Sequence, residues 1–492
     1  MEIFKLFLQS SSLTSLLEAL VVLLLLYFIF FSNFRSKEAR KEPSGPKPLP
    51  LLGNLLQLDP KIPYNTLLQL SKEYGSVFTV YLGLKKVVVL AGYKTVKEAL
   101  VNHADEFGGR DPILLLHERN EGHGVLWSNG DSWREMRRFS LSNLKDFGMG
   151  KRACEDKITE ECEHLIQLFL QFKGEAFDTT QPVYYPVANI ICSMVYGSRF
   201  EYDSPELASL LGRIYKLGPL LGSPSVKAYN LFPWVFKWIA NRKEFHRLET
   251  LNPLRCRGFM DAFLVKKQKL EESGITNSHF HDENLLMTVS NLFSAGTDTT
   301  ATTLRWGLLL MAKHPKIQNQ VQEELSRVIG SRQVRLDDRK NLPFTNAVIH
   351  ETQRMANIAP IAIPHKTTRD VTFQGHFIKK GTAVYPLLTS VLFDEDEWET
   401  PHTFSPAHFL DKDGKFVKRD AFLPFSAGPR VCLGESLARM ELFLFFTTLL
   451  QHFHFTPPPG VSVDEFDVTP QLLLFLEPPP HKLCATPRLY ND

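Results

Sequence analysis

Residues 425–434, Phe-Ser-Ala-Gly-Pro-Arg-Val-Cys-Leu-Gly, place a single cysteine in a loop that ends where a strong helical pattern begins. Gly428 and Gly434 let the backbone turn sharply and approach a flat object closely. The pattern that follows, Glu435–Leu442, predicts a helix whose N-terminal N–H groups and positive dipole end point at the sulfur of Cys432, which favours thiolate over thiol. A thiolate held in this way is a soft metal ligand or a nucleophile, and a buried structural cysteine is the plainer alternative.

Every fixed position of Phe-x-x-Gly-x-Arg-x-Cys-x-Gly is filled in this segment, which therefore resembles the haem-binding signature of the cytochrome P-450 superfamily. In that family a cysteine thiolate holds the haem iron. The resemblance implies that haem b is the cofactor, that Cys432 is its axial ligand, and that Phe425 and Arg430 belong to its binding site, with the arginine paired to a propionate. It also implies a mainly α-helical fold with a smaller β region, an α+β protein behind a single N-terminal transmembrane helix.

The composition fits a large apolar interior. The chain has 492 residues, of which 43% are hydrophobic and 37 are Phe, so we expect a core suited to apolar ligands. The formal net charge of +2 argues against nucleic acid as a partner. Six scattered cysteines without a C-x-x-C pair indicate a reduced, cytosol-facing protein rather than a disulfide framework: Cys154, Cys162, Cys192, Cys256, Cys432 and Cys484.

The N-terminal segment Leu13–Phe31 is apolar apart from Thr14, Ser15 and Glu18. Its nineteen residues would form a helix about 28 Å long, enough to cross the hydrocarbon layer. A cleaved signal peptide is the alternative, but no small-residue cleavage site precedes the basic cluster that follows. By the positive-inside rule, that cluster places the following domain on the cytoplasmic side: Arg35, Lys37, Arg40 and Lys41.

The chain therefore divides into a membrane anchor (residues 1–34), a basic and proline-rich hinge (residues 35–50) and a haem-thiolate catalytic domain (residues 51–492). Residues 43–50 carry four prolines, which exclude helix and central strand and predict a stiff spacer. The hinge resembles that of microsomal members of the family, which implies the endoplasmic reticulum membrane with the catalytic domain facing the cytosol.

Further haem contacts are implied by the resemblance. Trp133 and Arg137 are four residues apart on a predicted helix and can address one anion together, although a surface amphipathic helix is the plainer interpretation. In the family, Trp-x-x-x-Arg contacts the haem propionates, and Arg110 and His365 match two other propionate contacts. Between Arg110 and Trp133, the apolar segment Ile113–Leu116 is predicted to be a loop.

Asp282–Lys313 is one long helical pattern that contains Ala295-Gly-Thr-Asp-Thr-Thr300. Glycine weakens a helix, and threonine hydroxyls compete for carbonyls one turn back, so we expect a bend with a small polar notch. An ordinary Thr-rich buried helix is the alternative. The segment resembles the oxygen-binding groove of the haem-thiolate monooxygenases, which implies that Thr299 and Asp298 organise water and deliver protons during catalysis.

Glu351-x-x-Arg354 places an acid and a base on one helical face, a common pattern that usually means an exposed ion pair. Here it resembles the structural core of the family, which adds an arginine from Pro-x-Arg-Phe. This chain has Pro-Ala-His-Phe at residues 406–409, with His408 at the arginine position. Histidine also replaces this arginine in the vertebrate family-two branch. The replacement leaves open whether His408 is charged as the third partner of Glu351 and Arg354.

Two strand patterns around Gly83, Val77–Leu82 and Lys86–Leu90, predict a hairpin. Leu437–His452 predicts an apolar helix under the haem, and Gln471–Leu476 predicts a strand with a turn at the far wall of the pocket. The aromatic stretch from Arg213 to Phe245 is interpreted as a mixture of core, membrane-facing surface and lid. The predicted pocket residues are almost all apolar: Ile113, Leu115, Phe293, Ala295, Ile358, Ile361, Ala362 and Phe475.

The resemblance covers the chain from anchor to cysteine loop and implies a monooxygenase that inserts one oxygen atom of O2 into a lipophilic substrate such as a fatty acid, a steroid or a xenobiotic. NADPH–cytochrome reductase is the implied electron donor, with cytochrome b5 as a further candidate partner. A haem-thiolate isomerase, which needs no external electrons, is disfavoured by the intact Asp298–Thr299 pair. A haem sensor or an apolar-ligand carrier is the non-enzymatic alternative. Measuring NADPH consumption that depends on the reductase would distinguish the monooxygenase, the isomerase and the non-enzymatic protein.

Overall fold

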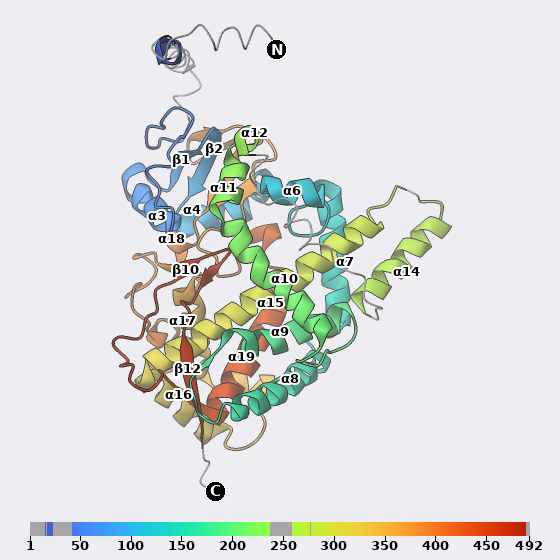
Figure 1. Ribbon diagram of the computed structural model, residues 1–492, viewed down its shortest axis with the longest axis vertical. Coiled ribbons are helices and arrows are strands. Elements are labelled where there is room, and N and C mark those ends of the chain that lie inside the picture. The colour runs from blue at the N-terminus through green and yellow to red at the C-terminus, as the bar shows by residue number, and fades with distance from the viewer. Residues whose placement is uncertain (1–14, 16, 23–41, 237–257, 276, 489–492) are drawn as a thin grey trace.

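A computed structural model describes residues 15, 17–22, 42–236, 258–275 and 277–488 (Figure 1). Long helices form most of this part of the chain; β1 (Val77–Leu82) and β2 (Lys85–Leu90) of the main sheet lie near its N-terminal end, and β12 (Lys482–Pro487) lies nearer its C-terminal end (Figure 1). The helices are α3 (Pro63–Tyr74), α4 (Tyr93–Lys97), α5 (Ala104–Phe107), α6 (Leu114–Asn120), α7 (Gly130–Asp146), α8 (Arg152–Gln171), α9 (Thr180–Val195), α10 (Pro205–Gly222), α11 (Pro224–Leu231), α12 (Pro233–Phe236), α14 (Phe259–Glu272), α15 (Asp282–Lys313), α16 (Pro315–Val328), α17 (Pro343–Ala356), α18 (Thr389–Leu392) and α19 (Glu435–His452).

The strands form one five-stranded sheet and three smaller sheets in the described residues. The five-stranded sheet has the order β1-β2-β8-β5-β3, and the smaller ones pair β6 with β7, β10 with β11, and β4 and β9 with β12. The strands are β1 (Val77–Leu82), β2 (Lys85–Leu90), β3 (Gly109–Arg110), β4 (Phe177–Asp178), β5 (His365–Lys366), β6 (Val371–Phe373), β7 (His376–Ile378), β8 (Ala383–Pro386), β9 (Phe453–Thr456), β10 (Gln471–Leu472), β11 (Leu476–Glu477) and β12 (Lys482–Pro487). The mainly α fold with a smaller β region is thus confirmed.

Register within the main sheet places two predicted haem contacts together. The hairpin β1–β2 is antiparallel, with Val77 opposite Leu90, and it confirms the predicted pair of strands around Gly83. At the other edge of the sheet, β3 pairs with β5 so that Arg110 lies opposite His365. Residues separated by more than 250 positions in the sequence therefore become cross-strand neighbours.

Helix α15 crosses the middle of the molecule (Figure 1) and packs against α9, α16, α17 and α19. It runs without interruption from Asp282 to Lys313, the bounds predicted from the sequence. Acidic residues lie in its first turn and Lys313 in its last, which suits the helix dipole. Most of its second half is buried against α9, α17 and α19, so its polar residues there have to find partners inside the protein.

Three of the four residues in the apolar segment 113–116 are helical and Ile113 is the extended residue before them, so the predicted loop is wrong from Leu114 on. Leu114–Asn120 forms α6, in which Leu115 and Leu116 are buried against Val226 and Tyr229 of α11. Consecutive leucines are good helix formers, and the neighbouring α11 supplies the apolar surface that makes a short helix stable.

The proline-rich segment 43–50 forms neither a helix nor a named strand, as its prolines require. Ser44 accepts a backbone hydrogen bond from Thr79 of β1 at 2.7 Å. A Cβ atom on Gly45 would lie 1.9 Å from the Thr79 carbonyl oxygen, so only glycine fits this contact. The segment thus packs on the outer strand of the main sheet.

Leu13–Phe31 and the basic residues at positions 35–41 lie almost entirely outside the described residues. Ser15 and Leu17–Val22 are described and helical. Within the described part of the chain, no helix has the length and apolar character needed to cross a bilayer.

Candidate active site

The cysteine loop depends on an unusual backbone. Gly428 has a φ of 74°, and a Cβ atom there would lie 1.8 Å from the Leu100 carbonyl oxygen. Ser426 also adopts a left-handed φ, 63°, which costs energy for a residue with a side chain. The Cys432 N–H donates to the Phe425 carbonyl at 3.1 Å, which closes the loop before α19 starts at Glu435.

The Cys432 sulfur lies at the N-terminal end of α19, as predicted, and accepts hydrogen bonds from the backbone N–H groups of Gly434 and Glu435. Burial nevertheless raises the pKa of this thiol; Glu435 adds to the rise, whereas the two N–H groups and the Arg137 guanidinium oppose it. The N–H groups at the helix end thus favour the thiolate, as predicted, but burial of the thiol outweighs their effect. A metal cation on the sulfur reverses this balance, since coordinated thiols are deprotonated.

The surface of Cys432 is accessible to solvent even though protein atoms surround it closely, so we take its sulfur to face an interior space. The other described cysteines, Cys154, Cys162, Cys192 and Cys484, are all buried. All five are free thiols, in line with the expected reduced pattern.

Three buried or half-buried arginines converge beside this loop. Burial and the nearby Arg137 lower the pKa of Arg110 to about 9. Burial, Arg110 and Arg137 lower the pKa of Arg430 to about 8. These shifts show that three cations repel one another in a poorly solvated place, an arrangement that is stable only when anions are close.

The hydrogen bonds of these arginines go to neutral oxygens and leave donors free. Arg110 donates to the Ile363 carbonyl at 2.8 Å, Arg137 to the Val431 carbonyl at 2.7 Å, and Arg430 to the Gly108 carbonyl at 2.9 Å. Within the described residues, Arg110 Nε and Arg430 Nη1 are buried without a hydrogen-bond partner.

Trp133 and His365 complete this group. The Arg430 guanidinium stacks over the Trp133 ring at 3.7 Å from its centroid, and Trp133 and Arg137 both lie on α7. His365 donates from Nδ1 to the Phe107 carbonyl at 2.7 Å, which leaves its buried Nε2 without a partner in the described residues. The structure thus brings together all five residues predicted to contact the propionates: Arg110, Trp133, Arg137, His365 and Arg430. Their unpaired donors and excess positive charge fit the two carboxylates of haem.

The segment 295–300 lies in the buried middle of α15, yet some of its positions are accessible. Ala295 is exposed and Thr299 half-buried, whereas Thr297, Asp298 and Thr300 are buried. Thr299 Oγ1 donates to the Ala295 carbonyl at 2.7 Å, and Thr303 Oγ1 donates to the Thr299 carbonyl at 2.8 Å. The predicted competition of threonine hydroxyls for carbonyls one turn back is therefore confirmed at Thr299, whereas Thr297 Oγ1 is buried without a hydrogen-bond partner in the described residues.

Asp298 is buried, and burial raises its pKa to about 7. Tyr184 of α9 donates its phenolic hydrogen to Asp298 Oδ1 at 2.5 Å and lowers the pKa, as does Arg305, while Glu477 raises it. Tyr184 was not among the residues predicted from the sequence. It sits in a nearly uniformly apolar helix, and no local pattern marks it as the partner of a residue 114 positions away.

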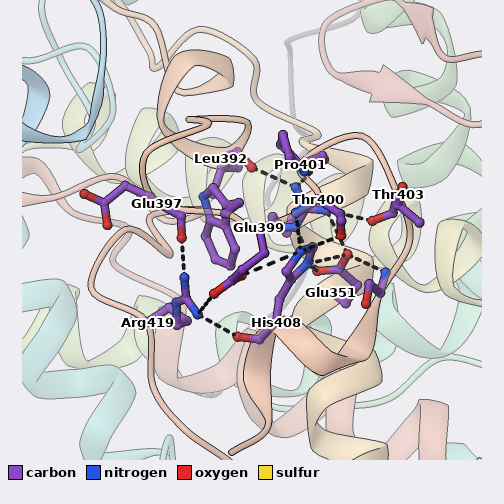
Figure 2. Close-up of polar contacts among 12 residues, drawn as sticks. Glu351, Leu392, Glu397, Glu399, Thr400, Pro401, Thr403, His408 and Arg419 are labelled. Atoms are coloured by element: carbon purple, nitrogen blue, oxygen red, sulfur yellow. Dashed lines mark hydrogen bonds and ion pairs between the residues drawn. The ribbon is translucent and has the colours of Figure 1, made fainter.

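The Glu-x-x-Arg pair is buried, unlike the exposed pair that the pattern suggests in isolation (Figure 2). Arg354 donates from Nε to Glu351 Oε2 at 2.8 Å and from Nη2 to Glu351 Oε1 at 2.7 Å, with both side chains 0% exposed. Its Nη1 donates to the carbonyls of Leu392 and Pro401 at 2.9 and 2.7 Å. The arginine thereby ties α17 to the long segment that leads to the cysteine loop.

His408 takes the third place in this network (Figure 2). Its Nε2 accepts the backbone N–H of Thr400 at 3.2 Å, so this nitrogen carries no proton. The proton is therefore on Nδ1, which lies 3.2 Å from Glu351 Oε1 and donates to it. A neutral histidine thus satisfies both Glu351 and Thr400.

The predicted pocket residues fall into two groups. Leu115, Phe293 and Ala362 are buried in apolar clusters, and Ala295, at the accessible part of α15, is exposed. The half-buried members are Ile113, Ile358, Ile361 and Phe475. The turn between β10 and β11 reaches this region, because the Leu476 N–H donates to the Ile358 carbonyl at 2.8 Å.

Comparison with known proteins agrees with this site. The family model described as cytochrome P450 matches residues 43–485. Cytochrome P450 2K4 of Oncorhynchus mykiss is 60% identical over 99% of this chain and 100% of its own length. Cytochrome P450 2F2 of Mus musculus is 46% identical over 87% of this chain and 90% of its length, and cytochrome P450 2B4 of Oryctolagus cuniculus is 44% identical over the same shares. The chain therefore belongs to the cytochrome P450 family, in its vertebrate family-two branch, and is a haem b monooxygenase that oxidises lipophilic substrates with electrons passed from NADPH by a reductase.

Proposed function

We propose that Cys432 is the axial ligand of the haem iron and that Asp298 and Thr299 supply protons to the oxygen chemistry of this monooxygenase. Bound haem supplies the iron centre at which O2 is activated, and thiolate ligation favours cleavage of the O–O bond. The chain itself has to hold the haem, orient the substrate, exclude stray water and deliver protons.

Holding the haem falls to the buried cations beside the cysteine loop. Arg110, Arg137 and Arg430 repel one another, so two propionates would lower the energy of all three. The stacked Trp133 stands at the same place and has an indole N–H to donate, whereas His365 Nε2 carries no proton in the neutral ring and would donate to a propionate only in the imidazolium form. Phe425 supports the site through its carbonyl, which receives the Cys432 N–H.

The proton role rests on the position of Asp298, a buried carboxyl that accepts the Tyr184 hydroxyl hydrogen and adjoins the accessible Thr299, and burial raises its pKa to about 7. A carboxyl with this pKa both accepts and releases a proton at neutral pH, as a general acid has to do repeatedly. Thr299 is the next residue, and its hydroxyl is on the accessible part of α15, so it can pass a hydrogen bond on to the reacting oxygen. Apolar side chains make up the proposed substrate pocket, which suits a lipophilic molecule.

The test is Thr299→Ala in the purified protein with reductase and NADPH. We expect NADPH oxidation to continue, product formation to fall by up to ~10²–10⁴-fold, and hydrogen peroxide to rise. Thr303→Ala is the matched control, because it removes the same kind of hydroxyl-to-carbonyl bond one turn further along α15. If product per NADPH in Thr299→Ala equals that of the unaltered protein, the proton role is wrong. Turnover without NADPH would indicate an isomerase instead.

The proposal includes an endoplasmic reticulum location with residues 1–34 as anchor, residues 35–50 as hinge and residues 51–492 as a cytosolic catalytic domain. In support, exposed apolar side chains gather where α12 meets the main sheet. Trp234 is 66% exposed and Leu56 is 73% exposed. Phe232, which precedes α12, lies against Gly83, whose other near neighbour is the Leu51 carbonyl. An apolar surface of this kind suits contact with a membrane.

Protease added to intact microsomes tests the orientation. Residues beyond Pro50 should be degraded without detergent, whereas full protection would mean that the domain lies in the lumen. Cytochrome b5 is proposed as a second electron donor, and product formation with and without added cytochrome b5 tests that part.

A further inference from the structure

A buried polar cluster starts at Asp298, in the predicted oxygen groove, and continues along α15 to residues that the groove does not include. Asp298, Thr302 and Arg305 are spaced four and three residues apart and so share this face. Their side chains are at most 9% exposed. Three groups that prefer water are thus held inside the protein, and each has to be satisfied by other polar groups or by ordered water.

The inner end of the cluster is Tyr184 of α9. Its hydroxyl donates to Asp298 Oδ1 at 2.5 Å and lies 3.3 Å from Thr302 Oγ1. The Tyr215 ring of α10 lies 5.1 Å from the Tyr184 ring. The Tyr215 hydroxyl is buried and has no hydrogen-bond partner in the described residues, although it is close enough to Asp298 and Arg305 for their charges to affect it.

The middle of the cluster is Arg305, which is 4% exposed. Its Nη1 lies 3.6 Å from Glu477 Oε2, too far for a direct hydrogen bond. Both Nε and Nη1 are buried without a hydrogen-bond partner among the described residues. Unpaired buried donors with a carboxylate 3.6 Å away are the kind of place where buried water is found.

The outer end reaches the surface. The Glu477 side chain on β11 is 24% exposed, and Asp178 on β4 is exposed. The charges of Arg305 and His481 both act on Asp178, and His481 Nε2 lies 3.1 Å from Thr179 Oγ1. Polar groups therefore follow one another from Asp298 in the core to two carboxylates at the edge of the protein.

We propose that this cluster is the route by which protons from solvent reach Asp298, with Glu477 and Tyr184 as relay groups and Arg305 as a positioning residue. This inference rests on the proposed role of Asp298 as proton donor. For each proton that Asp298 releases, the Tyr184 hydroxyl passes its hydrogen to the carboxylate and takes one from a neighbouring water. That water is recharged from solvent through Glu477. One proton enters for each proton used, and no electron moves.

Arg305 serves this route without transferring a proton, because a guanidinium stays protonated. Its unpaired N–H groups would orient the water between Tyr184 and Glu477. The charged and titratable groups that face Asp298 are Tyr184, Tyr215, Arg305 and Glu477, with Asp178 and His481 further out. Burial and Glu477 raise the pKa of Asp298 to about 7, while Tyr184 and Arg305 lower it. It therefore accepts a proton from the route at neutral pH.

The test compares Tyr184→Phe with Tyr202→Phe. Tyr202 is a matched control, because its hydroxyl donates to the buried Glu161 carboxylate at 2.7 Å and neither residue belongs to the route. Purified variants are first checked for haem content and for the thiolate carbon monoxide spectrum. Product per NADPH, hydrogen peroxide and the solvent deuterium isotope effect on product formation are then measured between pH 6 and 8.

For Tyr184→Phe we expect product per NADPH to fall by up to ~10²-fold, the lower end of the range of general acid–base contributions, with more peroxide and a larger solvent isotope effect. Tyr202→Phe should match the unaltered protein in all three readouts. Glu477→Gln, at the partly exposed end, is a second variant should Tyr184→Phe fail to fold, and it should show the same changes. Unaltered coupling and isotope effect in Tyr184→Phe, or in Glu477→Gln where only that variant folds, would overturn the route.

Asp298→Asn separates the two proposals. If Asp298→Asn loses coupling while Tyr184→Phe and Glu477→Gln do not, the route is wrong and the role of Asp298 stands. If all three variants keep full coupling, both proposals are wrong.

Discussion

Replacing Glu351 by glutamine should destabilise the protein strongly although it changes hardly any volume. Glu351 Oε1 receives the Ser405 N–H at 2.8 Å, the His408 Nδ1–H at 3.2 Å and Arg354 Nη2 at 2.7 Å. Glu351 Oε2 receives Arg354 Nε at 2.8 Å. A glutamine that keeps its oxygen at the first position has to place an NH2 group against the Arg354 Nε–H, so two donors face each other.

The magnitude follows from the burial of the pair. With both side chains 0% exposed, the Arg354 cation in Glu351→Gln keeps backbone carbonyls, the Met355 sulfur and the Phe393 and Trp398 rings as neighbours, and loses the carboxylate that balances its charge. Removing one partner of a buried ion pair typically costs ~3–5 kcal/mol. Native proteins have about 5–15 kcal/mol of stability in total, so this loss is about a fifth of the margin or more. We therefore expect a low yield of haem-containing protein and a clearly lower unfolding temperature.

Glu271→Gln is the matched control. Glu271 lies four residues after Lys267 on α14, 4.0 Å from its Nζ, and its side chain is 58% exposed. A pair of this kind contributes about 0–1 kcal/mol. Thermal unfolding followed by circular dichroism, together with haem content, should separate the two variants. If Glu351→Gln unfolds at the same temperature as Glu271→Gln, the buried pair does not stabilise the fold as argued.

Three further outcomes are expected. Cys432→Ser should lose the red-shifted carbon monoxide band of thiolate ligation while Cys154→Ser keeps it; a normal spectrum in Cys432→Ser would remove that residue as ligand. Arg137→Ala, which also loses the 2.7 Å bond to the Val431 carbonyl, should contain less haem, whereas full occupancy would exclude Arg137 as a necessary contact. Burial raises the pKa of Glu441 well above its ordinary value, opposed by a hydrogen bond from Thr300, so this carboxyl stabilises the fold at low pH and loses that contribution as pH rises towards its folded pKa. The unfolding temperature of the unaltered protein relative to Glu441→Gln should therefore fall between pH 5 and pH 8, and a constant difference would contradict the shift.

Local patterns predicted the elements that a single stretch of chain determines. The bounds of α15 follow from periodicity and from the charges at its two ends, and α19 follows from its apolar run. The segment 113–116 was misassigned because four apolar residues in a row fit a loop, a strand or a short helix. The helix is stabilised by contact with Val226 and Tyr229, and a local sequence pattern cannot predict that contact because the two segments are far apart in the sequence.

The site was predictable where the family signature names a residue, and not where a polar group depends on a distant partner. Arg110, Trp133 and Arg430 were predicted from motifs, and the structure places them together. Tyr184 and Arg305 carry no motif, because their importance comes from lying beside Asp298 and Glu477 in the folded chain. A tyrosine or an arginine in an apolar helix indicates only that some buried partner exists.

His408 shows how the structure answers a question that the sequence leaves open. The usual arginine would bring a second cation to a pair, Glu351 and Arg354, that is already balanced in charge. A neutral histidine supplies the one N–H that Glu351 lacks, and its other nitrogen accepts the Thr400 N–H at 3.2 Å. A cation does lie nearby, but closer to the surface than Glu351. It is Arg419, which lies 5.2 Å from the Trp398 ring centroid and donates to Glu399 at 3.0 Å (Figure 2). The cation is thus moved to a partly solvated position, where it is easier to stabilise, and the buried carboxylate keeps its hydrogen bonds.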